Sequence, residues 1–91
     1  MKATWNGETI AESDDIVTVE GNAYFPAASV NQAYLKPSDH HTTCPWKGEA
    51  SYFSLGDDSN AVWSYETPKA GVEAIAGHLA FYPDKVEIER A

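Results

Sequence analysis

The sequence predicts one mainly β domain of short antiparallel strands, with one or two short helices. Turn signals recur at short intervals, and the runs between them are rich in β-branched and aromatic residues, as in a chain of short strands. A length of 91 residues is enough for one domain and too few for two. Hydrophobic residues make up 43% of the chain, a share that supports a folded core rather than disorder.

The N-terminal third has the turn spacing of a meander of about four strands. Asn6-Gly7 lies between residues 3–5 and 9–11, and this dipeptide is a strong hairpin signal because both residues tolerate a positive φ. Residues 16–20 and 23–25 flank a second Gly-containing turn and are predicted to form two further strands.

One short helix is predicted after this meander. Pro26 is suited to the first helical turn, and residues 27–35 have a rough helical period. The helix should end before Pro37, because the residue preceding a proline avoids the helical region. Residues 38–45 are polar and are expected to form a loop.

The second half is predicted to hold another hairpin, a short helix and a final pair of strands. The turn cluster at residues 56–60 separates strands at 46–55 and 61–65. Beyond it we expect a helix near 69–74 and strands near 77–82 and 86–89.

The charge balance narrows the class of partner. Six Lys and Arg residues against fourteen Asp and Glu residues give a net charge of −8, which disfavours nucleic acid and anionic membranes. The basic residues are also scattered along the chain. A single cysteine and a first segment without a long apolar stretch predict a cytoplasmic protein with no signal peptide or membrane span.

Five segments, in order, resemble a known family: WNGETIAES, VEGNAYFP, CPWKGEASYF, AVWSYETP and IAGHLAFYPDKVEI. Together they are similar to the small bacterial family named domain of unknown function 427. The resemblance implies a β-tent, in which two antiparallel sheets meet at an angle, as in methionine-R-sulfoxide reductases and the thalidomide-binding domain of cereblon. Many β-tents hold a structural zinc with two CxxC pairs, but this sequence has only Cys44, so that zinc is not expected.

The family is sometimes labelled nucleotidyltransferase, and the sequence gives no support to that label. It contains no Gly-Ser followed by paired aspartates and no glycine-rich loop to cradle phosphates. We therefore expect no cofactor.

Residues 40–48 contain the highest concentration of side chains that could bind a metal or act in catalysis. His40, His41 and Cys44 are possible metal ligands, with His78 as a further candidate, although their spacing matches no common zinc motif. Adjacent histidines can converge in a loop and diverge on a strand. The alternative is a polar loop with solvated histidines.

Cys44 is also a candidate nucleophile. A reactive thiolate needs a nearby base or cation, and His40, His41 and Lys47 are close in sequence. The alternative is a cysteine packed as a small hydrophobe, which is common for a lone cysteine.

The third hypothesis is an aromatic-walled groove for a small molecule or a peptide. Alternation along a strand from Trp46 places Trp46 and Tyr52 on one face, with small residues between them, and Trp63 and Tyr65 share a face of the partner strand. Lys47 is then expected to point to the other face, beside Glu49. The alternative is that these rings are simply core.

The leading prediction from the sequence is a non-catalytic binding module. Its predicted groove has four aromatic walls and four polar residues at its mouth: Trp46, Tyr52, Trp63 and Tyr65, then His40, His41, Thr43 and Lys47. An enzyme using Cys44 with His40 or His41 is the alternative, and the oligomeric state stays open.

Overall fold

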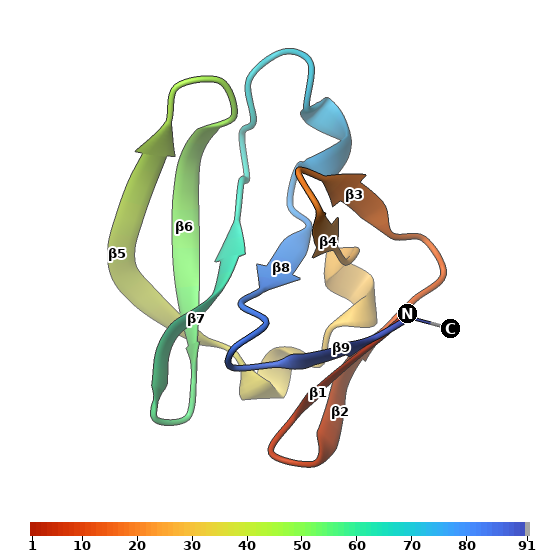
Figure 1. The fold of residues 1–91 in the computed structure, drawn as a ribbon. Coiled ribbons are helices and arrows are strands. Elements are labelled where there is room, and N and C mark those ends of the chain that lie inside the picture. Colours follow the sequence, from red (N-terminus) through yellow and green to blue (C-terminus); the bar gives the residue numbers. More distant parts are fainter. Residues whose placement is uncertain (91) are drawn as a thin grey trace.

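In the computed structural model, residues 1–90 are described and form nine strands and three 3₁₀ turns (Figure 1). The strands are β1 Lys2–Trp5, β2 Glu8–Glu12, β3 Val17–Val19, β4 Asn22–Tyr24, β5 Lys36–Cys44, β6 Gly48–Leu55, β7 Asp58–Ser64, β8 Leu79–Phe81 and β9 Glu87–Glu89. They pair into a four-stranded sheet, β5-β6-β7-β8, a three-stranded sheet, β2-β1-β9, and the β3–β4 hairpin. Every strand pair is antiparallel, so the predicted mainly β class is confirmed.

Turn chemistry places the N-terminal hairpins where the sequence predicts them. Asn6 and Gly7 have φ values of +51° and +79°, as a two-residue type I′ turn requires. Glu20 and Gly21 do the same between β3 and β4, with φ values of +53° and +79°. The second turn therefore begins one residue earlier than Gly21-Asn22, and this shift places the Glu20 side chain on the turn.

The helix predicted over residues 27–35 is two 3₁₀ turns instead, η1 Ala27–Ser29 and η2 Gln32–Tyr34. Between them Val30 is extended and bridges to Ala11 of β2, and the N–H of Asn31 donates to the carbonyl oxygen of Ile10. Pairing with β2 satisfies the backbone here, so tertiary contacts override the local helical pattern.

The helix predicted near residues 69–74 is also a single 3₁₀ turn, η3 Glu73–Ile75. Gly71 has a φ of +101°, which a right-handed helix excludes. No helix within residues 1–90 has the length and apolarity needed to cross a bilayer.

The predicted loop over residues 38–45 is wrong, because most of it belongs to β5. This nine-residue strand lies at the edge of the four-stranded sheet, and seven of its residues are exposed. An edge strand with little burial carries polar side chains on both faces, so its composition imitates a loop. The next strand, β6, begins only at Gly48, which leaves Trp46 and Lys47 in the turn between the two strands.

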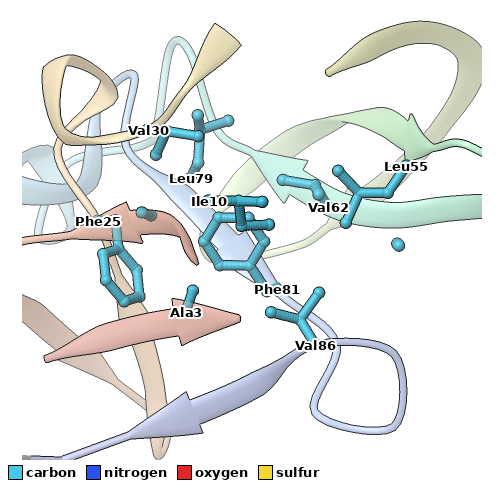
Figure 2. Close-up of a cluster of buried hydrophobic side chains, with 11 residues drawn as sticks. Ala3, Ile10, Phe25, Val30, Leu55, Val62, Leu79, Phe81 and Val86 are labelled. Atoms are coloured by element: carbon cyan, nitrogen blue, oxygen red, sulfur yellow. The ribbon is translucent and has the colours of Figure 1, made fainter. Parts of the chain in front are cut away.

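Two hydrophobic clusters hold the sheets together. The first joins the three-stranded sheet to the four-stranded sheet, with Ala3 and Ile10 on one side and Val62 and Phe81 on the other (Figure 2). Its two phenylalanines, Phe25 and Phe81, meet edge to face with ring centroids 5.5 Å apart.

The second cluster packs the β3–β4 hairpin and the η3 segment against the four-stranded sheet. Its buried members are Tyr24, Ala50, Tyr52, Trp63, Tyr65, Val72, Ile75 and Ala80. Three of the four rings predicted for the groove are therefore core residues of this cluster, as the alternative reading of the aromatics expects. Any site on this face must use the exposed groups at its margin.

Candidate functional site

Strand pairing defines one face of the four-stranded sheet, which we call the aromatic face. Residues directly opposite each other in neighbouring strands project to the same face. Tyr52 pairs with Trp63, and Trp63 pairs with Ala80. Two pairs between β5 and β6 extend this face, Thr42 with Ala50 and Cys44 with Gly48.

Four rings cross the aromatic face in a line that we call the ring row: His40, Tyr52, Trp63 and Tyr82. The His40 and Tyr52 rings lie 4.6 Å apart between centroids, and so do the Trp63 and Tyr82 rings. Tyr52 and Trp63 are each 8% exposed, whereas His40 is exposed and Tyr82 is 38% exposed. The row therefore has a buried centre and two solvent-facing ends.

Hydrogen-bonding groups accompany the ring row. The hydroxyls of Thr42 and Tyr52 lie 2.9 Å apart, and the Trp63 indole N–H donates to the Tyr24 hydroxyl at 3.1 Å. Burial, and then the neighbouring Tyr52 hydroxyl, raise the pKa of Tyr82 to about 12. Tyr82 therefore keeps its proton, and remains a donor, at neutral pH.

The aromatic rings and carboxylate around Lys47 form a second arrangement, which we call the lysine cage: Trp46, Tyr65 and Glu20. The Lys47 Nζ lies 2.6 Å from a carboxylate oxygen of Glu20, 5.4 Å from the Trp46 ring centroid and 5.3 Å from that of Tyr65. Lys47 as a whole is only 7% exposed. Burial is the largest single influence on the pKa of Lys47 and acts to lower it. The hydrogen bond to Glu20 and the electrostatic attraction of Tyr24, Tyr65 and Glu20 together outweigh burial, so the pKa lies above its ordinary value and the ammonium stays charged.

The predicted positions of Lys47 and Trp46 need correction. Lys47 does not point away from the aromatic residues beside Glu49, and Trp46 does not stand in the ring row. Both lie in the turn before β6, where the alternation of a strand does not apply. Trp46 is 47% exposed and lies against Lys47 at one margin of the second cluster.

Two of the residues predicted at the mouth, His41 and Thr43, lie on the opposite face of the sheet. His41 pairs with Ser51, and Thr43 pairs with Glu49. His40 and His41 therefore diverge, as adjacent residues on a strand do. Within residues 1–90 no three His, Cys, Asp or Glu side chains gather to hold a metal, so His40, His41 and Cys44 do not form the ligand set considered from the sequence. The further candidate, His78, has its Nδ1 3.1 Å from the carbonyl oxygen of Ala76.

Neither His40 nor His41 lies next to Cys44. It is half-buried and packs against the second cluster, on the aromatic face. His40 shares this face, but four residues along a strand correspond to about 13 Å, and His41 faces the other way. The Lys47 ammonium is engaged by Glu20. Neither histidine is therefore placed as a base beside Cys44, and the Lys47 cation is already paired with a carboxylate.

The sequence interpretation missed Tyr82, Tyr24 and Glu20. Tyr82 was open to detection, because Ala80 and Tyr82 alternate along β8 and its extension, so both project to the face of Trp63. Glu20 carries no such signal, since it is 27 residues from the lysine it contacts.

A hollow of about 400 Å³ lies elsewhere, on the three-stranded sheet, lined by Met1, Lys2, Glu12, Glu89 and Arg90. It is wide and shallow, and the Lys2–Glu89 ion pair within it spans 3.8 Å between exposed side chains. Its lining offers no ring and no buried polar group, so the aromatic face is the stronger candidate site.

Comparison with known protein families gives a match over the full length of the chain. A family model described as "Domain of unknown function (DUF427)" matches residues 1–91, and the family's short name carries a nucleotidyltransferase label. No curated protein matches the chain.

Proposed function

The chain belongs to the DUF427 family, whose description assigns no activity, and we propose from its site that it is a non-catalytic binding module. Its ligand is a small molecule or a peptide segment that contacts the exposed rings at the ends of the ring row, His40 and Tyr82. The polar contacts come from the hydroxyls of Thr42 and Tyr82 and from the His40 ring.

The observation that carries this proposal is the exposure at the two ends of the ring row. A row of core rings alone would leave all four buried, yet His40 is exposed and Tyr82 is 38% exposed. Each exposed ring packs against a buried one at a centroid distance of 4.6 Å, with the ring planes tilted by 60° for His40 and 51° for Tyr82, so the exposed rings are held in place before a ligand arrives. Preorganised aromatic surface with a few polar groups is typical of small-ligand sites.

The charge of the molecule limits the ligand. A net charge of −8 repels anions, so the proposed ligand is neutral or cationic. A flat ring or a planar cation matches the faces of His40 and Tyr82, because both kinds of group stack on aromatic faces.

The proposal is tested by titrating isotope-labelled protein with neutral and cationic aromatic fragments and with short tryptophan-containing peptides. We expect the Trp63 indole signal and the signals around Tyr52 to shift and saturate. A Tyr82→Ala substitution should weaken binding roughly two- to tenfold, the value of one aromatic pair.

Adjacent histidines supply a matched control. His40→Ala removes a ring of the row, whereas His41→Ala removes an exposed ring from the opposite face of the same strand. Binding should weaken in the first variant and stay unchanged in the second. If no probe shifts the ring row, or if both histidine variants behave alike, the proposal fails.

We also propose that the protein acts in the cytoplasm and does not bind nucleic acid. The presence of one cysteine supports the cytoplasmic location, and the net charge of −8 argues against binding of nucleic acid. Retardation of DNA or RNA by the purified protein at physiological salt would contradict the second.

A further inference from the structure

The lysine cage has the composition of a cation-binding site. It places two aromatic faces, Trp46 and Tyr65, and one carboxylate, Glu20, around a single ammonium group. Aromatic cages of this kind recognise alkylammonium ligands by cation–π attraction, and an adjacent carboxylate adds charge complementarity. Here the ammonium at the centre belongs to the chain itself.

We infer that Trp46, Tyr65 and Glu20 form a binding site for an external alkylammonium group, and that Lys47 closes this site until such a ligand replaces it. The inference is independent of the proposed function, because the lysine cage and the ring row share no residue. The ligand class is a protonated or methylated amine, either free or on a lysine of a partner protein.

Burial of Lys47 needs a reason beyond stability. Lys47 is only 7% exposed while the side chain of its partner Glu20 is 50% exposed, and the cost of burying an ammonium can exceed the gain from its ion pair. A leucine or methionine would fill the same space without the cost of burying an ammonium. Lys47 can instead act as an internal ligand. When no external ligand is bound, its ammonium neutralises the Glu20 carboxylate and its side chain covers the Trp46 and Tyr65 rings.

The margin of the cage is open to solvent. Trp46 is 47% exposed and the Glu20 side chain is 50% exposed, so an external cation can approach both before Lys47 leaves. The net charge of −8 also raises the local concentration of cations at the surface.

The turn that carries Lys47 is anchored independently of its side chain. The Lys69 N–H donates to the carbonyl oxygen of Lys47 at 2.9 Å, and the Lys69 ammonium donates to that of Pro45 at 2.8 Å. Tyr65 is likewise held through its carbonyl oxygen by the N–H of Gly77 at 3.1 Å. The Lys47 side chain can therefore rotate out while the backbone beneath Trp46 and Tyr65 stays in place.

Because Lys47 competes with an external alkylammonium ligand for the lysine cage, the wild-type protein should bind that ligand measurably more weakly than a variant without the Lys47 side chain. If Lys47 leaves the cage in about one tenth of the molecules, the apparent dissociation constant is about tenfold above the intrinsic one. Removal of the side chain should recover that factor.

The test compares Lys47→Ala with Lys47→Met, using tetramethylammonium chloride as the probe and sodium chloride at the same ionic strength as the reference. Alanine empties the cage, whereas methionine removes the charge but refills the space. We expect the Trp46 indole signal to report binding about tenfold tighter in Lys47→Ala than in wild type, and no such gain in Lys47→Met. Adding Glu20→Gln to Lys47→Ala should remove most of the gain.

The wild-type protein provides a second measurement that does not depend on how Lys47→Ala folds. Because Lys47 is only 7% exposed, we expect it to react slowly in reductive methylation by formaldehyde and cyanoborohydride. Tetramethylammonium should expose it and raise its methylation rate. Mass spectrometry of the Lys47 peptide measures that rate, and exposed Lys36 provides the internal control. A folded Lys47→Ala variant that binds no probe overturns the inference, as does a wild-type protein in which neither Lys47 methylation nor the Trp46 signal responds.

A peptide carrying one trimethyllysine distinguishes the two sources of the ammonium group. Tighter binding of this peptide than of tetramethylammonium assigns the site to a protein partner. Equal binding assigns it to a small amine.

Discussion

The ammonium of Lys47 lies 2.6 Å from the carboxylate of Glu20, which joins the turn before β6 to the turn between β3 and β4. This ion pair spans 27 residues of sequence and connects the hairpin that covers the second cluster to the sheet beneath it. Packing of the hairpin and closure of the lysine cage therefore depend on the same contact.

A Glu20→Gln substitution tests the contribution of this pair to stability. Lys47 is buried while Glu20 is half-exposed, so the cost should lie between those of exposed and buried pairs, about 1–2 kcal/mol of unfolding free energy. Urea unfolding measures it, with an unchanged m-value expected. Glu89→Gln is the matched control, because the Lys2–Glu89 pair spans 3.8 Å between exposed groups and should contribute less than about 0.5 kcal/mol. Equal losses in the two variants would refute a special role for Glu20.

Stability should fall at alkaline pH. The pKa of Tyr82 is about 12 in the folded protein, against about 10 in an unfolded chain, so its contribution is complete below about pH 10 and is lost as the pH approaches 12. The pKa values of Lys47 and Tyr65 are also raised and act in the same direction. Urea unfolding at a series of pH values should show this decline, and Tyr82→Phe should make it shallower. An identical decline in wild type and Tyr82→Phe would contradict the environment described for Tyr82.

The hydrogen bond from the Trp63 indole to the Tyr24 hydroxyl should be sensitive to removal of its acceptor. Tyr24 is fully buried, and Tyr24→Phe leaves an indole N–H unsatisfied at a cost of about 1–3 kcal/mol. A double-mutant cycle with Trp63→Phe should show coupling, since that variant also removes the donor. Tyr34→Phe removes an exposed hydroxyl bonded to Glu8 and should destabilise the protein much less than Tyr24→Phe. Strict additivity in the cycle would show that the bond contributes nothing.

Local sequence signals predicted the hairpins because they act within a few residues. Asn6-Gly7 specifies its own turn, whatever the rest of the chain does. Alternation along β6 and β7 also predicted which residues share a face within each strand, and the register of the structure places Tyr52 opposite Trp63. The same reasoning failed at Trp46 and Lys47, where the strand had not yet begun.

The elements that were misread are those whose state depends on distant partners. The segment containing Val30 is extended because its backbone pairs with β2. The polar segment β5 is a strand because it forms backbone hydrogen bonds with β6. Neither partner is visible in the local pattern. Because β5 is a strand rather than a loop, His40 and His41 point to opposite faces, and within residues 1–90 they do not gather with Cys44 into a metal ligand set.

The sequence by itself determined the class of fold, the first hairpin turn and the alternation that puts Ala50 with Tyr52, and Trp63 with Tyr65, on one face of their own strand, because backbone preference and side-chain alternation are properties of neighbouring residues. The tertiary structure alone decided that Tyr52 lies opposite Trp63, that Tyr82 packs against Trp63 and that Glu20 reaches Lys47. These contacts between residues far apart in sequence form when separate strands and turns pack together, and that packing is governed by burial and electrostatics across the whole molecule.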